Sequence, residues 1–250
     1  MEIFLNIAAS VLFFILGCFI GSYLNILIYS ASKKGTLKGW SYCSFCRKRI
    51  QNIDRIPVIS YFILKGKCRY CGKPISPRYI IAELLTAVLY LIAYLVLGFS
   101  AELIYALILF PVLIILSVWD LNHKEISYIC CIIIAVLGIA SIFTSHIPWY
   151  EHFVGAIIVS IPFAVLCFLG ALGGGDVLLM AAAGLLLGWS IVPSVLIGII
   201  LGSIFGLVVK KITKSNIIVF GPFLSVGIFV GFLWGEKIIN AYLGIIYPMT

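Results

Sequence analysis

The segment Ile3–Tyr29 reads IFLNIAASVLFFILGCFIGSYLNILIY and contains no Asp, Glu, Lys or Arg. A helix of about 20 apolar residues crosses the roughly 30 Å hydrocarbon core of a bilayer, so this segment is long enough to span it. Only Met1 and Glu2 precede it and a strongly basic segment follows, which reverses the charge order of a secretory signal peptide. We therefore expect an uncleaved transmembrane helix whose N-terminus lies outside the cell.

The rest of the chain has the same apolar character. Of its 250 residues, 63% are hydrophobic and 10% are charged, and the mean hydropathy is +1.21. Soluble domains carry about 25% charged residues, so this composition excludes a soluble globular domain. We predict an all-α polytopic membrane protein of about eight transmembrane helices. After the first helix, we expect the others near residues 79–98, 102–119, 128–145, 153–172, 177–190, 194–209 and 217–235.

One segment, residues 31–78, differs sharply from this pattern. It holds 12 of the 17 basic residues and one acid, Asp54, for a net charge of +11, whereas the whole chain carries +8 and the remainder therefore −3. The positive-inside rule places this segment in the cytoplasm. We divide the chain into a first transmembrane helix (1–30), a cytoplasmic insert (31–78) and a transmembrane core (79–250). Because no recognition motif accompanies the charge, we expect anionic lipid headgroups, and no nucleic acid, as the partner of the insert.

Two C-x2-C pairs lie within the insert, Cys43 with Cys46 and Cys68 with Cys71. Four thiolates at this spacing are typical of a tetrahedral zinc site. About 48 residues build a poor apolar core unaided, and a structural metal would compensate for that. Two disulfides are the first alternative, which a cytoplasmic location disfavours. Four unrelated buried thiols are the second.

Outside the insert the chain has two aspartates, Asp120 and Asp176. The predicted topology places both at cytoplasmic ends of transmembrane helices. A carboxylate inside a bilayer costs about 2.5–3.5 kcal/mol at the centre, so such a group is usually paired or functional. Two carboxylates at one depth can share a proton and hold a water molecule between them, which is the chemistry of an aspartic peptidase.

The residues before Asp176 are Gly173, Gly174 and Gly175. Glycine-rich backbone at the membrane boundary permits the close approach of a substrate peptide, which favours catalysis. The alternative is a flexible turn in which Asp176 caps the helix that follows.

These features occur in a fixed order together with several other motifs. The chain thereby resembles the bacterial type IV prepilin peptidases, which are membrane aspartic peptidases with a Gly-x-Gly-Asp motif. The matching pieces are Gly21–Asn25 (GSYLN), the two C-x2-C pairs, Ile56–Tyr61 (IPVISY), Ile75–Tyr79 (ISPRY) with Glu83, Asp120-Leu121, Gly173–Asp176 and Phe220–Phe223 (FGPF).

The resemblance implies cleavage of the basic leader of prepilins or pseudopilins at the cytoplasmic face of the bacterial cell membrane. It implies that Asp120 and Asp176 are the catalytic pair. Because the insert is typical of bifunctional members, it also favours N-methylation of the new N-terminus with S-adenosylmethionine, although no nucleotide-binding fingerprint is found. Glu83 is then a candidate for methyl transfer or leader binding, whereas a structural role would pair it with Arg78 or another basic residue.

Three positions depart from the usual family pattern: Ser127, Leu178 and Val219. None of them removes a carboxylate, but they affect expectations about substrate choice. Two other functions remain as alternatives. One is an intramembrane Gly-x-Gly-Asp protease that cuts other membrane helices. The other is a metal or ion transporter with a cysteine sensor, which requires further polar residues at mid-membrane depth.

Overall fold

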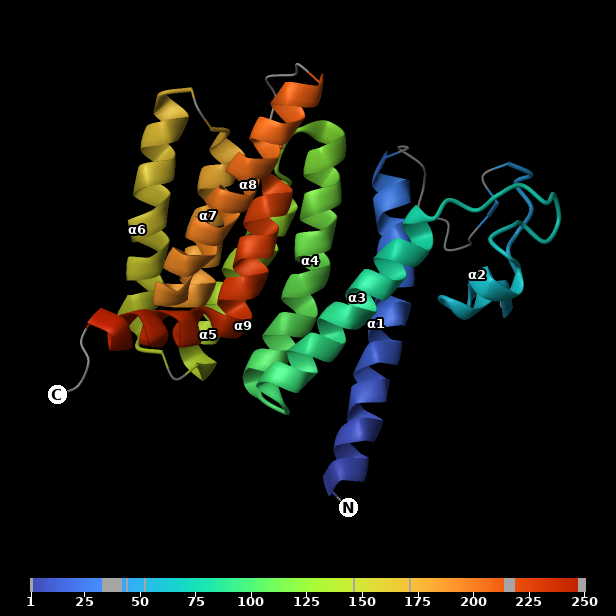
Figure 1. Cartoon of the computed structure of the whole chain (residues 1–250), viewed down its shortest axis with the longest axis horizontal. Coiled ribbons are helices and arrows are strands. Elements are labelled where there is room, and N and C mark those ends of the chain that lie inside the picture. Colours follow the sequence, from blue (N-terminus) through green and yellow to red (C-terminus); the bar gives the residue numbers. More distant parts are fainter. Residues whose placement is uncertain are drawn as a thin grey trace. The chain divides into compact units, whose positions relative to one another are not determined.

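The computed structural model describes residues 2–32, 42–43, 45–51, 53–145, 147–170, 172–213 and 219–246. Within these residues the secondary structure is helical apart from two isolated β-bridges, which confirms the predicted all-α class (Figure 1). The chain divides into two compact units, Met1–Phe99 and Ser100–Thr250, and each is described by itself. Four lysines, Lys33, Lys34, Lys38 and Lys214, lie outside the described residues.

Unit 1 pairs two long helices, α1 (Glu2–Ser32) and α3 (Arg78–Leu97). Two glycines of α1 lie directly against the backbone of α3. A Cβ at Gly17 would lie 2.5 Å from Cα of Ala87, and a Cβ at Gly21 would lie 2.7 Å from Cα of Glu83. Small residues at such a crossing let two membrane helices approach closely, so Gly21 brings α1 against the first turns of α3.

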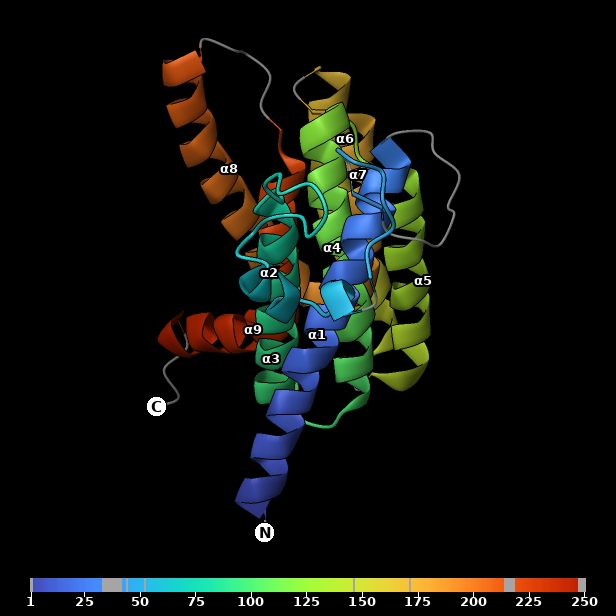
Figure 2. The ribbon, with the colours of Figure 1, turned by 90° about the vertical axis from the view of Figure 1, so that its right-hand side faces the viewer.

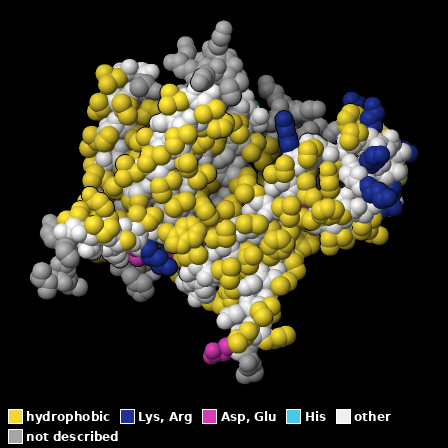
Figure 3. Space-filling view, in the orientation of Figure 1, with side chains coloured by type: hydrophobic (Ala, Val, Ile, Leu, Met, Phe, Trp, Pro, Cys, Tyr) yellow, Lys and Arg dark blue, Asp and Glu magenta, His cyan; other side chains and the backbone are white. Residues whose placement is uncertain are grey.

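The described part of the insert has little regular structure. It contains the short 3-10 turn η1 (Ile53–Arg55), the five-residue helix α2 (Ile59–Ile63) and the two isolated bridges. Figure 3 shows Lys and Arg side chains gathered on the insert, whereas hydrophobic side chains cover the visible face of the helices. The insert is therefore the polar, charged part of unit 1.

Unit 2 is a bundle of helices joined by short connections, which run alternately up and down (Figures 1 and 2). Its elements are α4 (Ala101–His123), α5 (Tyr128–Thr144), α6 (Trp149–Phe168), α7 (Gly174–Leu187), η2 (Gly188–Ser190), α8 (Ile191–Thr213) and α9 (Gly221–Ile246). The C-terminal end of α4 and the N-terminal ends of α5, α7 and α9 thus lie at one end of the unit, the upper end in Figure 1.

Six segments of the described chain are long and apolar enough to cross a membrane, and Tyr128–Thr144 is a shorter apolar helix. One of the six, Gly174–Val208, folds as two helices, α7 and α8, which reverse direction at η2. Counting both gives eight apolar helices in the described residues, in agreement with the predicted number. At 14 residues, α7 is about 21 Å long and shorter than the hydrocarbon core.

The last helix extends beyond the expected transmembrane segment. We expected a span near 217–235, whereas α9 continues to Ile246. Its final part turns and runs across the end of unit 2 opposite to the N-termini of α7 and α9 (Figures 1 and 2). Most side chains of residues 236–246 are exposed. Because the apolar pattern continues past the bend, composition alone did not locate the point where α9 leaves the bundle.

Helices α6 and α7 meet at glycines. A Cβ at Gly184 would lie 2.7 Å from Cα of Ala156, and a Cβ at Gly155 would lie 2.8 Å from the carbonyl oxygen of Gly184. The fully buried His152 reinforces this contact, since its Nδ1 donates to the carbonyl of Leu185 at 2.8 Å. The 20-residue α6 and the shorter, 14-residue α7 thus pack at backbone distance.

We predict that Gly184→Ala destabilises the protein. Replacing Gly by Ala in a helix normally stabilises it by about 1 kcal/mol. Here the new methyl group would overlap α6, and overpacking of this kind costs about 1–3 kcal/mol. Thermal unfolding in detergent should show a lower midpoint for Gly184→Ala. Gly244→Ala is the matched control, because no other part of the described chain lies within 4 Å of the added Cβ. An unchanged or raised midpoint for Gly184→Ala would show that the contact is not tight.

Candidate functional site

Asp120 lies in the last turn of α4 and is 5% exposed. Its Oδ2 accepts a hydrogen bond of 2.7 Å from the backbone N–H of Gly221, the first residue of α9 and 101 positions away in sequence. The N-terminus of a helix carries a partial positive charge, so α9 provides a favourable environment for this carboxylate. Asp120 is thus held by a second helix rather than by its own.

Asp176 is the third residue of α7 and is 9% exposed. Its Oδ2 accepts the backbone N–H of Gly173 at 3.2 Å, and its own N–H donates to the carbonyl of Gly173 at 3.1 Å. The helix cap that we considered as an alternative role is therefore present. A capping carboxylate keeps a second oxygen, so capping and catalysis are compatible here.

The two carboxylates lie close enough for their charges to interact. The connection between α4 and α5 is packed against the glycine motif, since a Cβ at Gly175 would lie 2.8 Å from Cβ of Ile126. Two buried carboxylates within electrostatic range favour a state in which they share one proton. Such a pair can supply a general base and a general acid at the same time.

Three residues of α5 and α9 have no chemical role that the sequence motifs predict. Gly221, which belongs to the FGPF motif, donates its backbone N–H to Asp120. Ser225, one turn further along α9, is buried, and its Oγ has no hydrogen-bond partner within the described chain. Cys131 of α5 is buried and lies within electrostatic range of Asp176. The FGPF motif was the available sequence signal for Gly221, but the motif alone does not show that its residues contact Asp120.

The four cysteines of the insert form a compact cluster. The Sγ atoms of Cys43, Cys46, Cys68 and Cys71 all lie within 4.8 Å of one another, and those of Cys43 and Cys71 are 3.8 Å apart. Tetrahedral zinc with sulfur ligands at about 2.3 Å requires sulfur–sulfur distances of about 3.8 Å. All four are free thiols rather than disulfides. The donor set and its spacing fit a zinc ion.

The two C-x2-C pairs have the same local backbone. The N–H of Cys43 donates to the carbonyl of Lys48, and that of Cys68 donates to Lys73 in the same way. Four positions after the first cysteine of each pair, Arg47 (φ 54°) and Gly72 (φ 67°) adopt left-handed conformations and donate back to Cys43 and Cys68. A side chain in this region is strained, so Arg47 is held there by the surrounding turn.

Polar contacts support the cysteine cluster. The backbone N–H of Cys46 lowers the pKa of the Cys43 thiol to about 7, whereas burial and hydrogen bonds with the other three thiols raise the pKa of Cys71 to about 11. Arg69, within the second pair, binds both oxygens of Asp54 at 2.6 and 2.8 Å. This bidentate contact lowers the pKa of Asp54. It also ties η1 to the second pair of cysteines.

Glu83 joins three parts of unit 1. Its Oε2 accepts the backbone N–H of Val58 at 2.8 Å, and the hydroxyl of Ser22 also hydrogen-bonds to its carboxylate. Val58 is a β-branched residue with φ 62°, an unusual conformation that aims its N–H at Glu83. The expected ion pair with Arg78 is not found, and the described residues give Glu83 no other ionic partner. Its charge thus faces backbone and hydroxyl donors.

The departures from the family pattern leave the carboxylates in place. Ser127 is the N-cap residue of α5, and its side chain makes no capping hydrogen bond. Leu178 is 47% exposed on α7 and lines an apolar groove beside Asp176. The other residues of that groove are Ala164, Cys167, Phe168, Gly174 and Val177. Val219 precedes α9 and is half-buried.

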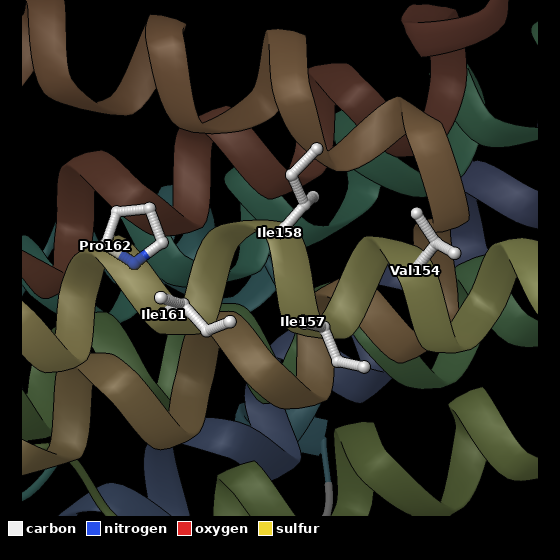
Figure 4. Close-up of a pocket in the computed structure, with 5 residues that line it drawn as sticks. All are labelled: Val154, Ile157, Ile158, Ile161 and Pro162. Carbon is white, nitrogen blue, oxygen red and sulfur yellow. The ribbon is translucent and has the colours of Figure 1, made fainter.

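A larger groove lies on α6 and is unrelated to these groups. Figure 4 shows its lining residues, which recur at helical spacing along one face of α6: Val154, Ile157, Ile158, Ile161 and Pro162. None of them is titratable or nucleophilic. This groove therefore offers an apolar surface and no chemistry.

Comparisons with known proteins agree with the motifs. The bacterial peptidase A24 N-terminal domain matches residues 15–97, and the type IV leader peptidase family matches residues 107–209. A prepilin leader peptidase/N-methyltransferase of Bacillus subtilis (strain 168) is 30% identical over 91% of this chain and 90% of its own length. One from Legionella pneumophila is 33% identical over 82% of this chain and 75% of its own length.

A third relative is the type 4 prepilin-like proteins leader peptide-processing enzyme of Escherichia coli O78:H11 (strain H10407 / ETEC). It is 32% identical over 84% of this chain and 88% of its own length. No solved structure matches the chain significantly. The two domain matches occur in order along the chain, and the relatives align over most of this chain and of their own length. These findings confirm the resemblance: the chain belongs to the type IV leader peptidase family.

Proposed function

We propose that this protein removes the leader peptide of type IV prepilins or pseudopilins and then methylates the new N-terminal residue. The relatives aligned over most of the chain carry both activities in their names. The observation that carries the peptidase activity is the pair of buried carboxylates, Asp120 and Asp176, at one end of unit 2. The family membership supplies the substrate class.

The carboxylate pair accounts for hydrolysis without a further group. The ionised carboxylate takes a proton from a water molecule while the protonated one polarises the scissile carbonyl. The water oxygen then bonds to the carbonyl carbon. The C–N bond breaks, and the departing nitrogen takes up a proton from the acid member of the pair.

The topology proposed for this reaction is a multi-pass protein of the bacterial cell membrane with its N-terminus outside. The insert and both aspartates then lie on the cytoplasmic side, as the charge distribution favours. The insert presents exposed apolar residues on α2, with Phe62 67% and Ile63 63% exposed, near Lys65 and Lys67. Basic and apolar side chains together suit anionic lipid headgroups.

Unit 1 is the proposed place of methyl transfer. S-adenosylmethionine supplies an activated methyl group from a positively charged sulfonium. Glu83 is a half-buried carboxylate without an ionic partner among the described residues, so its chemistry fits a cationic ligand. Val58 and Ser22 would hold the Glu83 carboxylate in place for that contact. The four cysteines would hold zinc, which gives the small insert a fixed core.

The carboxylate mechanism predicts that both aspartates are required for cleavage. Asp120→Asn and Asp176→Asn should each lower the rate of leader cleavage by at least about 100-fold, because each removes a proton-transfer group. The measurement is the mass of a candidate prepilin after incubation with the purified enzyme. Glu151→Gln, at the other end of unit 2, is the control and should cleave normally. Normal cleavage by either aspartate variant would exclude the carboxylate mechanism.

The cysteine cluster predicts one bound zinc ion. Elemental analysis of the purified protein should find one zinc per chain, and a Cys43→Ser/Cys46→Ser variant should lose it because half of the ligands are gone. Cys167→Ser, which lies in α6, should keep the metal. A wild-type protein with four reactive thiols and no metal would rule out the site.

Substitution of Glu83 should separate N-methylation from leader cleavage. Glu83→Gln should lower N-methylation of the cleaved product by about 10-fold or more, because hydrogen bonds to a charged group contribute about 1.5–3 kcal/mol. Leader cleavage should stay at the wild-type rate, since the aspartates belong to unit 2. The same mass spectrum reports both steps. Full methylation by Glu83→Gln would leave Glu83 with a structural role only.

A further inference from the structure

We infer that Gly221 is a positioning residue for peptide hydrolysis: its backbone N–H and its lack of a side chain orient the Asp120 carboxylate at the N-terminus of α9. This inference rests on the proposed function, because it assumes that Asp120 acts on the substrate. It adds a residue outside the matched peptidase domain, which ends at residue 209. The relevant contact joins two helices of the same unit.

The position of Asp120 on its own helix is unfavourable. It lies in the last turn of α4, where the helix carries a partial negative charge and free carbonyl groups. A buried carboxylate there needs a donor from another element. The donor that the described structure provides is the N–H of Gly221, at 2.7 Å from Oδ2.

The first turn of α9 leaves this N–H available for Asp120. Pro222 has no N–H, and the N–H groups of Phe223 and Leu224 both donate to the carbonyl of Phe220, at 3.1 and 3.2 Å. The N–H of Gly221 has no carbonyl partner within its own helix, as expected for the first residue of a helix. The sequence Phe-Gly-Pro-Phe therefore directs one backbone donor out of the helix, and Asp120 receives it.

Position 221 also has no room for a side chain. A Cβ at position 221 would overlap Oδ2 of Asp120 and would lie 3.0 Å from its Cγ and 3.1 Å from its Cβ. Both Asp120 and Gly221 are buried. A side chain at this position would therefore push the carboxylate away from the helix terminus.

The two aspartates are thus positioned by different means. The Asp176 carboxylate accepts a hydrogen bond from the N–H of Gly173, three residues earlier in the chain. Its orientation is therefore set by a local contact. Asp120 depends on a contact across 101 residues, so its orientation relative to Asp176 depends on the packing of α9 against α4. A displacement of about 1 Å in a catalytic group can cost about 100-fold in rate.

The test is Gly221→Ala in the full-length protein, with steady-state cleavage of a candidate prepilin in detergent. We expect kcat to fall by about 100-fold while KM stays within about twofold, because the change moves a catalytic group and not the substrate-binding surface. Gly244→Ala, in the open part of α9, is the matched control and should match the wild type. A purely structural role would lower the amount of active enzyme and leave the kcat of the folded fraction unchanged, which would overturn the inference.

Asp120→Asn, measured in parallel, separates the inference from the function on which it rests. If Asp120→Asn cleaves normally, the proposed mechanism fails and the role of Gly221 fails with it. If Asp120→Asn is inactive and Gly221→Ala is fully active, only the positioning role is wrong. If Gly221→Ala does not accumulate, the Gly221→Ala/Asp120→Ala variant decides. Restored accumulation places the conflict at Asp120 and supports the inference, and continued failure overturns it.

Discussion

Two carboxylates buried at one end of an apolar bundle are the constraint on which the arrangement of unit 2 depends. A buried carboxylate without donors is costly, so each must find a backbone N–H. Asp176 finds one at the start of its own helix, whereas Asp120 requires the start of α9. The N-termini of α7 and α9 therefore meet the C-terminus of α4 at the same end of the unit. The alternating course of the helices makes this meeting possible.

The same requirement shapes unit 1 on a smaller scale. Glu83 receives the N–H of Val58, which reaches it through an unusual backbone conformation, and the close approach of α1 at Gly21 brings Ser22 to the same carboxylate. The peptidase candidates and the methyl-transfer candidate thus belong to different units of the chain. Each can be altered by mutation without touching the residues of the other.

The fold class and most of the candidate residues were predictable, because they depend on composition and on the spacing of residues. The all-α class follows from apolar runs that are long enough to cross a bilayer, and the cysteine cluster follows from two C-x2-C pairs. The rarity of acidic residues in the core singled out Asp120 and Asp176. The capping contact of Asp176 was also foreseeable, since it is local. By contrast, the hydrogen bond from Val58 to Glu83 was not foreseeable, because it joins residues 25 positions apart through an unusual backbone conformation at Val58.

By itself, the sequence determined the membrane character, the approximate helix count, the basic insert and the candidate residues for chemistry, since each depends on residue type and short-range order. Only the tertiary structure decided what orients Asp120, where α9 leaves the bundle and which atoms surround Glu83. The Gly221 N–H reaches Asp120 across 101 positions, and no local pattern records such a contact. It exists because two helix ends with opposite partial charges are brought together by packing.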